Sequence, residues 1–318
     1  MKMQPKIIII TVYHGRKGDS RFNKREDYLV ETIKSVNQQK MNNAYHLLID
    51  DGSTDDAMTH MQEKFPANAN RHYFKRPKRP GEPLSSTNAR NFGIELCLSN
   101  VIPHLTIAKN DYITFIDSDD VVINLNSRFD FLLKGNYRFG ISDCLLLMNG
   151  ESKARTWKGI SGGTAQMQKK FWVHGILPYP TMTWRVDFLQ ALQKYILEQF
   201  ERPGIFDPTI GCGEDVDVAY SSLKALTMSK STVGYLPKIT AGYRIHDTSL
   251  ATIRNQVKRK YEENSVLKRH NGIVTTYILH LRRLTVRPEC YFPYLYRFKN
   301  NSKSKVAVID YIPNWSAK

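Results

Sequence analysis

A predicted strand that runs directly into carboxylates is the feature of this sequence that most constrains its fold. Residues 111–116 are rich in aromatic and β-branched side chains, which is typical of a buried strand, and Asp117, Asp119 and Asp120 follow at once. Such closely spaced charge is unfavourable without a partner, and carboxylate oxygens are the ligands that Mg²⁺ and Mn²⁺ prefer. A polar turn that ends a strand or caps a helix has the same composition, so this stretch alone leaves both interpretations open.

The same pattern of an apolar run followed by acidic residues occurs earlier in the chain. The run Lys6–Tyr13 predicts a central strand, helical spacing predicts a helix over Arg25–Gln39, and Tyr45–Ile49 predicts a second strand that ends in Asp50 and Asp51. Strand, helix and strand in close succession are typical of a parallel sheet, in which ligands bind beyond the carboxyl ends of the strands. We therefore expect both acidic turns at one edge of an α/β sheet.

Further elements follow the same alternation of strands and helices. The predicted set comprises a helix at Ala57–Phe65, a strand at Arg71–Lys75, a helix capped by Ser85–Thr87 that carries Arg90, a strand at Asp143–Met148, a helix at Val186–Phe200, a helix entered through Gly211–Tyr220 and a late strand at Val233–Tyr243. Residues 178–185 are expected to form a rigid aromatic segment before one of these helices.

The charge of the chain indicates an anionic partner or surface. Lys and Arg number 46 against 30 Asp and Glu, a net charge of +16. Residues 251–318 hold 14 of these basic residues and 4 acidic ones, a net charge of +10. We expect a domain over residues 1–250 and a basic, aromatic extension over 251–318 that binds an acceptor or a surface. A solvated tail is the alternative for the extension.

The start of the chain contains no predicted membrane segment. The apolar run Ile7–Ile10 is far too short to span a bilayer, and Met1–Lys2 leads into it without the apolar core of a signal peptide. We expect a cytoplasmic protein, with the inner face of a membrane as an alternative location. The cysteines are scattered, without a C-x-x-C pair, and are expected to be core thiols: Cys97, Cys144, Cys212 and Cys290.

Five stretches, in this order, resemble motifs of the family 2 glycosyltransferases of GT-A fold. They are Asp50–Asp55, Ala89–Asn91, Asp117–Asp120, Gly213–Asp215 and Tyr243–Ser249. The resemblance extends from the first strand to about Ser249. It implies a mixed, mostly parallel central sheet flanked by helices, with a donor-nucleotide half at 1–125, an acceptor half at 126–250 and a helical or irregular extension beyond.

The resemblance implies an inverting transfer of a sugar from a nucleotide-sugar donor, with UDP as the expected nucleotide and Mn²⁺ or Mg²⁺ assisting. The base is then expected to stack near Tyr13, and Asp50 or Asp51 to accept a hydrogen bond from a ring N–H. Arg90 is expected to contact the nucleotide or the diphosphate. An ion pair between Arg90 and Glu95 or Asp51 is the alternative.

The metal ligands implied by the resemblance come from two distant stretches. Asp119 is the expected first ligand, Asp117 is expected at the ribose, the metal or a metal-bound water, and Asp120 is expected only to shape the turn. His246 corresponds to a late histidine that binds the metal in many members of the family. A structural role is the alternative for a single histidine.

Inversion requires a base that takes the proton of the acceptor hydroxyl. By its place in the Gly-Glu-Asp motif Asp215 is the expected base, and Glu214 is expected to bind or orient substrate, although the two could exchange roles. Acidic residues are also common in the first turn of any helix. Trp184 and Arg185 are expected to line the acceptor side, with a core anchor as the alternative for the aromatic residue.

Two basic loops distinguish this chain from the family pattern and favour an anionic acceptor. One is an insert at Gly15–Asn23, and the other carries Arg76, Lys78 and Arg79, three expected acceptor-binding residues. Basic residues beside the inferred site favour DNA with hydroxymethylated bases as the acceptor. A surface polysaccharide or lipid-linked glycan at an anionic membrane is the second candidate. The third hypothesis is a catalytically inactive module that binds a polyanion or nucleic acid.

Overall fold

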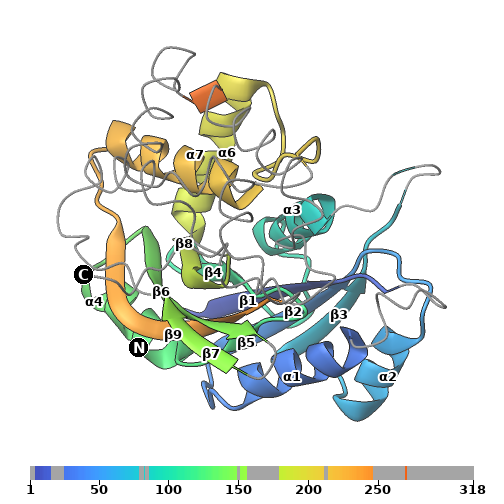
Figure 1. The fold of residues 1–318 in the computed structure, drawn as a ribbon. Coiled ribbons are helices and arrows are strands. Elements are labelled where there is room, and N and C mark those ends of the chain that lie inside the picture. The colour runs from blue at the N-terminus through green and yellow to red at the C-terminus, as the bar shows by residue number, and fades with distance from the viewer. Residues whose placement is uncertain are drawn as a thin grey trace, which may run out of the picture.

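Among the residues that the structure describes, nine strands form one mixed sheet with helices on both faces (Figure 1). The computed structural model describes residues 4–15, 25–78, 82, 86–148, 151–155, 179–210, 214–245 and 269–270. The strands are β1 Ile7–Tyr13, β2 Ala44–Asp50, β3 Arg71–Lys75, β4 Tyr112–Phe115, β5 Val121–Val122, β6 Phe139–Met148, β7 Glu151–Arg155, β8 Met182–Arg185 and β9 Gly234–Ile245. The helices are α1 Arg25–Asn37, α2 Ala57–Lys64, α3 Ser86–Leu98, α4 Leu125–Lys134, α6 Val186–Phe200 and α7 Glu214–Met228.

The first half of the sheet is parallel, as the sequence predicts. The strand order is β3-β2-β1-β4-β8-β6-β9-β5, with β7 paired to β6. Strands β3, β2, β1 and β4 run parallel, with Tyr13 opposite Asp50 and Ile10 opposite Phe115. The carboxyl ends of these strands therefore meet at one edge, which we call the acidic edge. The expectation of a mixed, mostly parallel α/β sheet flanked by helices is confirmed.

The side chains of β1 alternate between two apolar layers because both faces of this strand are covered. Ile8 and Ile10 pack in the core that α3, α6 and α7 share, whereas Ile7 and Ile9 pack with residues of α4 and α1. All four isoleucines are fully buried. Figure 1 shows α3, α6 and α7 on one side of the sheet and α1 and α2 on the other.

Strand β8 differs from the predicted rigid segment. It lies between β4 and β6 and runs antiparallel to both, with Tyr112 opposite Arg185 and Thr114 opposite Thr183. The beginning of β8 therefore lies toward the acidic edge and its end lies toward the opposite edge. A single 3-10 turn, Tyr179–Thr181, precedes it and lies on the acidic side.

Strand β9 returns the chain to the acidic edge. It pairs with β6 and, through Gly242 and Val121, with the short strand β5 that follows the acidic turn. The strand continues to Ile245, two residues beyond the predicted end, because pairing with β6 holds to that residue. No helix among the described residues is both long enough and apolar enough to cross a membrane. Most of the predicted extension lies outside the described residues.

Candidate active site

The acidic turn after β4 gathers the carboxylates that the sequence singles out. Asp117, Asp119 and Asp120 each offer an oxygen, and the three oxygens lie within 4.8 Å of one another. Asp117 and Asp119 are half-buried, whereas Asp120 is fully buried. Because hard carboxylate oxygens at this spacing match the preference of Mg²⁺ and Mn²⁺, the donor set fits a divalent cation.

Asp120, the buried residue of this turn, holds the turn in place through hydrogen bonds. The Asp120 carboxylate accepts a hydrogen bond from the Arg244 amide at 2.8 Å, and its main-chain oxygen accepts one from the Thr32 hydroxyl at 2.7 Å. These bonds fix the turn, in line with the shaping role expected for Asp120. Its second oxygen, Oδ2, is buried and accepts no hydrogen bond from the described residues. Burial and the charges of Asp119 and Asp117 raise the pKa of Asp120 well above its ordinary value.

Arg90 connects the acidic turn to the start of helix α7. It projects from the first turns of α3 and is 4% exposed. Its Nη2 lies 2.5 Å from Asp117 Oδ1, and its Nη1 lies 3.4 Å from Glu214 Oε1. Although burial opposes its charge, Asp117, Tyr179 and Glu214 raise the pKa of Arg90 above its ordinary value. The alternative pairing with Glu95 or Asp51 is wrong.

The first turn of α7 supplies two carboxylates in different environments. The Glu214 side chain is only 10% exposed and faces Arg90, whereas Asp215 is half-buried. Burial raises the pKa of Glu214 even though Arg90 acts in the opposite direction. Arg90 thus holds Glu214 in a pair, and the Asp215 carboxylate is the more accessible of the two. Gly213, which precedes them, lies outside the described residues.

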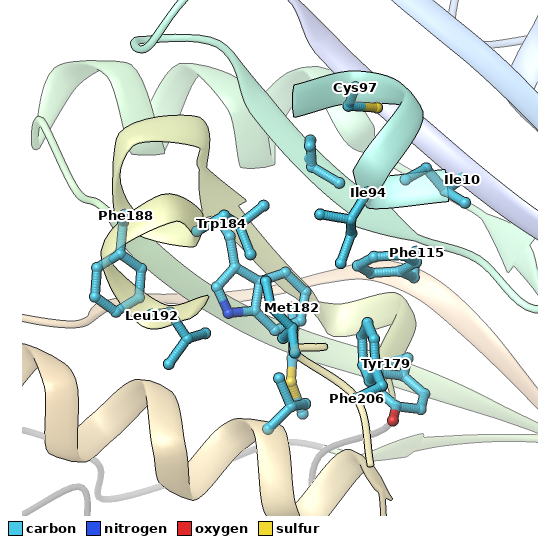
Figure 2. Packing of buried hydrophobic residues seen from close by; sticks show 14 of the residues in the cluster. Ile10, Ile94, Cys97, Phe115, Tyr179, Met182, Trp184, Phe188, Leu192 and Phe206 are labelled. Carbon is cyan, nitrogen blue, oxygen red and sulfur yellow. The ribbon is translucent and has the colours of Figure 1, made fainter. Parts of the chain in front are cut away.

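An aromatic layer lies beneath Arg90 that sequence reasoning did not assign to the site. The guanidinium carbon lies 4.2 Å from the centre of the Tyr179 ring and 5.9 Å from that of Phe206. Tyr179 and Phe206 meet edge to face, and Phe115 at the end of β4 contacts both (Figure 2). The Pro-Tyr-Pro run at 178–180 is the one signal in the sequence that marks this position.

The carboxylates after β2 are held by the loop and by one arginine. Asp50 Oδ1 accepts a hydrogen bond from the Ser53 amide at 2.8 Å. Asp51 is buried and pairs with Arg76 Nε at 2.6 Å, while Arg76 Nη1 lies 2.6 Å from Glu82. Arg76 is itself buried, so it supports the edge from within. Its predicted role as an acceptor-binding residue does not fit this position.

Tyr13 supports the same loop from the end of β1. Its ring is 1% exposed and packs with Leu29, Leu48 and Met58. Its hydroxyl donates a hydrogen bond of 2.7 Å to Asp55. The ring therefore offers no open face to a nucleotide base, and the base-stacking role expected for Tyr13 does not fit its position.

Lys78, another basic residue predicted to bind the acceptor, lies against the turn at Gly52. The side chain of Lys78 lies over Gly52, close enough that a Cβ added at this glycine would meet Lys78 Cδ at 3.0 Å. Gly52 has a φ of +75°, a conformation that other residues rarely adopt, so a glycine here allows both the turn and the close approach. Arg79 lies outside the described residues.

Strand β9 brings the stretch before His246 to the acidic turn. Arg244 Nε donates a hydrogen bond of 2.8 Å to the main-chain oxygen of Asp119, and its guanidinium lies 4.4 Å from the Tyr28 ring. Sequence reasoning missed this role of Arg244, although it lies within the Tyr-Arg-Ile-His run at 243–246. His246 itself lies outside the described residues.

The predicted acceptor residues of β8 do not lie at this site. Trp184 is fully buried, donates a hydrogen bond of 2.9 Å to Ser222 and packs among Phe188 and Leu192 (Figure 2). Arg185 lies at the opposite edge of the sheet and pairs with Asp187 at 2.8 Å. The prediction that Trp184 and Arg185 line the acceptor side is wrong. Strand β8 runs antiparallel to β4, so its last residues lie away from the acidic edge. The core-anchor alternative for Trp184 is confirmed.

Comparison with known sequences supports the assignment that the motifs suggest. Residues 20–125 match the family model described as glycosyl transferase family 2. The chain is 33% identical over 123 residues to an uncharacterized glycosyltransferase of Haemophilus influenzae, covering 36% of this chain and 43% of that protein. It is 33% identical over 95 residues to glycosyltransferase GlyG of Streptococcus pneumoniae, covering 30% of this chain and 27% of that one. The chain thus spans less than half the length of these two relatives.

Solved structures share the fold at low sequence identity. TarS residues 1–349 of S. aureus, in complex with UDP-GlcNAc, matches with a TM-score of 0.56 at 13% identity, covering 91% of this chain and 73% of that one. GalNAc-T7 with UDP, GalNAc and Mn²⁺ matches with a TM-score of 0.50 at 12% identity, covering 82% and 48%. The described structure therefore has the GT-A fold, and residues 20–125 of the chain are similar to the family 2 glycosyltransferases.

Proposed function

We propose that residues 1–250 form an inverting glycosyltransferase domain that moves a sugar from a UDP-linked donor to an acceptor hydroxyl. The observation that carries this proposal is the position of Arg90, which joins Asp117 of the acidic turn to Glu214 of α7. A donor held at the turn and an acceptor held at α7 are thereby brought to one place. Residues 1–125 supply the donor half and 126–250 the acceptor half.

The donor nucleotide is proposed to bind along the acidic edge. Asp50 ends β2 and Asp51 follows it, at the same edge of the sheet as the turn that carries Asp117, with β1 between the two strands. Asp51 is fixed by Arg76, which suits it to accept a hydrogen bond in a defined direction. UDP is favoured because TarS and GalNAc-T7, which share the fold, were solved with UDP-GlcNAc and with UDP.

A divalent cation fits the acidic turn, with Asp119 as the first ligand and Asp117 and His246 as further ligands. When bound, such an ion neutralises charge on a departing diphosphate. The buried Asp120 oxygen without a hydrogen bond supports a cation nearby. Mn²⁺ is favoured by its presence in the GalNAc-T7 structure. Arg90 holds the Asp117 carboxylate in place independently of any ion.

Asp215 is proposed as the base that accepts the proton of the attacking hydroxyl. A base must be reachable by the acceptor, and Asp215 is more exposed than its neighbour Glu214. Glu214 is paired with Arg90, which suits it to orient substrate rather than to take up a proton. Transfer with inversion then needs one base on the face opposite the leaving diphosphate.

The net charge of +16 favours an anionic acceptor or an anionic surface. DNA with hydroxymethylated bases and a membrane-associated glycan both meet this condition. The case for DNA is weaker than the sequence suggests, because Arg76 is buried in pairs with Asp51 and Glu82. Lys78 and Arg79 stay candidate acceptor contacts.

A transfer assay with two acceptors tests the proposal. The full chain is incubated with Mn²⁺, a panel of nucleotide sugars and either hydroxymethylcytosine-containing duplex DNA or a lipid-linked sugar, and the mass of each acceptor is measured. We expect one of the acceptors to gain the mass of one sugar when incubated with the wild-type chain. Asp215→Asn should produce no mass gain but should still bind the donor. An active Asp215→Asn variant would show that the base is another group. Donor binding without transfer to any hydroxyl would favour the inactive binding module.

A further inference from the structure

An ion-pair cluster around the buried Asp217 side chain of α7 includes residues 269 and 270. We call it the Asp217 cluster, and its members are Arg202, Asp207, Asp217, Arg269 and His270. Asp217 and His270 have side chains that are 1% and 0% exposed. No part of the proposed reaction uses these residues, although Asp217 lies within the first turn of the helix that carries Asp215.

Two segments meet at the Asp217 carboxylate, one with Arg202 and one with Arg269 and His270. Its Oδ2 lies 2.8 Å from Arg202 Nη1, and its Oδ1 lies 2.9 Å from His270 Nε2 and 3.5 Å from Arg269 Nη1. Arg269 also pairs with Asp207 at 2.6 Å, and Arg202 pairs with Asp207 at 3.0 Å. Two carboxylates and two guanidinium groups balance in charge when the imidazole is neutral.

The surroundings favour the neutral imidazole. Burial lowers the pKa of His270, as do the nearby cations Lys224 and Arg269, while Asp217 acts in the opposite direction. A neutral ring whose Nε2 carries the proton donates to Asp217. The ring also packs edge to face with Phe200, at 5.1 Å between centres, so its orientation is fixed on two sides.

The geometry of α7 connects this cluster to the site. Residues three apart on a helix lie on the same face, so Asp217 lies close to Glu214 within the first turn. The first turn of α7 is therefore held at Glu214 by Arg90 and at Asp217 by the cluster. Two attachments on one turn restrict both its rotation and its shift along the axis, and so restrict the direction of Asp215.

We infer that Arg269 and His270 are positioning residues that lock the first turn of α7 through Asp217 and so orient Asp215 for transfer. Residues 269 and 270 of the predicted extension then contribute to the acceptor half. This inference rests on the proposed function in assigning Asp215 its role, but the attachment itself does not.

Full-length His270→Ala and Arg269→Ala variants test the inference, with two controls outside the cluster. Arg138→Ala removes a guanidinium of similar exposure that also pairs with an aspartate and lies near a phenylalanine, 5.4 Å from the Phe188 ring, at the opposite edge of the sheet. His60→Ala removes an exposed histidine that contacts Glu26 at 3.3 Å.

Hydrogen exchange measured by mass spectrometry tests whether the Asp217 cluster holds the first turn of α7, and it does not require an active enzyme. We expect peptides from the first turns of α7 to exchange at least about tenfold faster in both cluster variants, because each loses a hydrogen bond to a charged group. Peptides from β1 and β2 should be unchanged, and both controls should match the wild type. His270→Gln, whose amide can donate to Asp217, should restore slow exchange.

Measurements of kcat and of UDP affinity test whether the attachment affects the reaction. We expect kcat to fall by about 10- to 100-fold, since small misplacements of a reacting group have effects of this size, while UDP affinity stays within about twofold. Unchanged exchange in α7, or equal acceleration throughout the chain, would overturn the inference. So would faster exchange in α7 with kcat unaltered. If no acceptor is modified by the wild type, the proposed function fails, whereas the exchange comparison still decides whether the pair holds α7.

Discussion

Replacing Arg90 by methionine tests the connection between the two halves of the site. Methionine retains much of the length and apolar volume of the side chain but removes the pairs with Asp117, at 2.5 Å, and Glu214, at 3.4 Å. It also removes a cation that lies 4.2 Å from the Tyr179 ring. Glu214 would then be a carboxylate with a 10% exposed side chain that has lost this partner.

The size of the effect follows from the burial of the pair. Breaking a buried ion pair by removing one partner lowers the free energy of unfolding by about 3 to 5 kcal/mol. Because the Asp117 side chain is 29% exposed and can recover hydrogen bonds from water, we expect the lower value, about 3 kcal/mol. Each kcal/mol shifts the melting temperature of a domain this large by about 2–4 °C, so the expected decrease is about 6–12 °C.

Thermal unfolding and titration with UDP and Mn²⁺ measure the two consequences. Arg185→Met is the control, because Arg185 also pairs with an aspartate but lies at the opposite edge and is more exposed, so its loss should shift the melting temperature by less than about 4 °C. Arg90→Met should weaken UDP binding by about tenfold or more, since Asp117 loses its orientation. A melting temperature that falls no further than in the control would refute this reasoning.

Three further changes have defined outcomes. Gly93→Ala should lower the free energy of unfolding by about 1–3 kcal/mol in a denaturant titration, because the new Cβ would meet Ile10 Cγ2 at 2.9 Å where α3 packs on β1. Although burial raises it, hydrogen bonds from Thr209 and pairing with two arginines lower the pKa of Asp207 to about 2 from 3.8, so its contribution to stability is present above about pH 4 and is lost as the pH falls toward 2. Melting temperatures across this range should show a smaller loss in Asp207→Asn than in the wild type. Trp184→Phe should lower the melting temperature, because it removes the hydrogen bond to Ser222, yet leave the affinity for acceptor unchanged.

The parallel half of the sheet could be predicted because its signal is local. The four consecutive isoleucines of β1 and the apolar run before Asp117 each predict a strand, and parallel strands necessarily bring their carboxyl ends to one edge. The turn-shaping role of Asp120 likewise follows from turn chemistry. The features that could be predicted from the sequence are therefore those that depend on residues close together in the chain.

The partners of the charged residues could not be predicted in the same way. Arg90 pairs with Glu214, a residue 124 positions away, and helix spacing carries no information about such a contact. Trp184 and Arg185 follow a proline-rich segment that gives no sign of strand direction, so the antiparallel course of β8 could not be foreseen. The burial of Arg76 was hidden for a similar reason, because three prolines and several cations nearby are typical of an exposed loop.

Metal-dependent donor binding by the acidic turn tests the central claim most directly. Affinity for a UDP-sugar is measured by calorimetry with and without Mn²⁺ in the wild type, in Asp119→Asn and in Asp130→Asn, which alters an exposed carboxylate on α4. We predict Mn²⁺-dependent binding in the wild type and in Asp130→Asn, and a loss of about tenfold or more in Asp119→Asn. Equal, Mn²⁺-dependent affinity in all three proteins would contradict the assignment of the acidic turn as the metal and donor site.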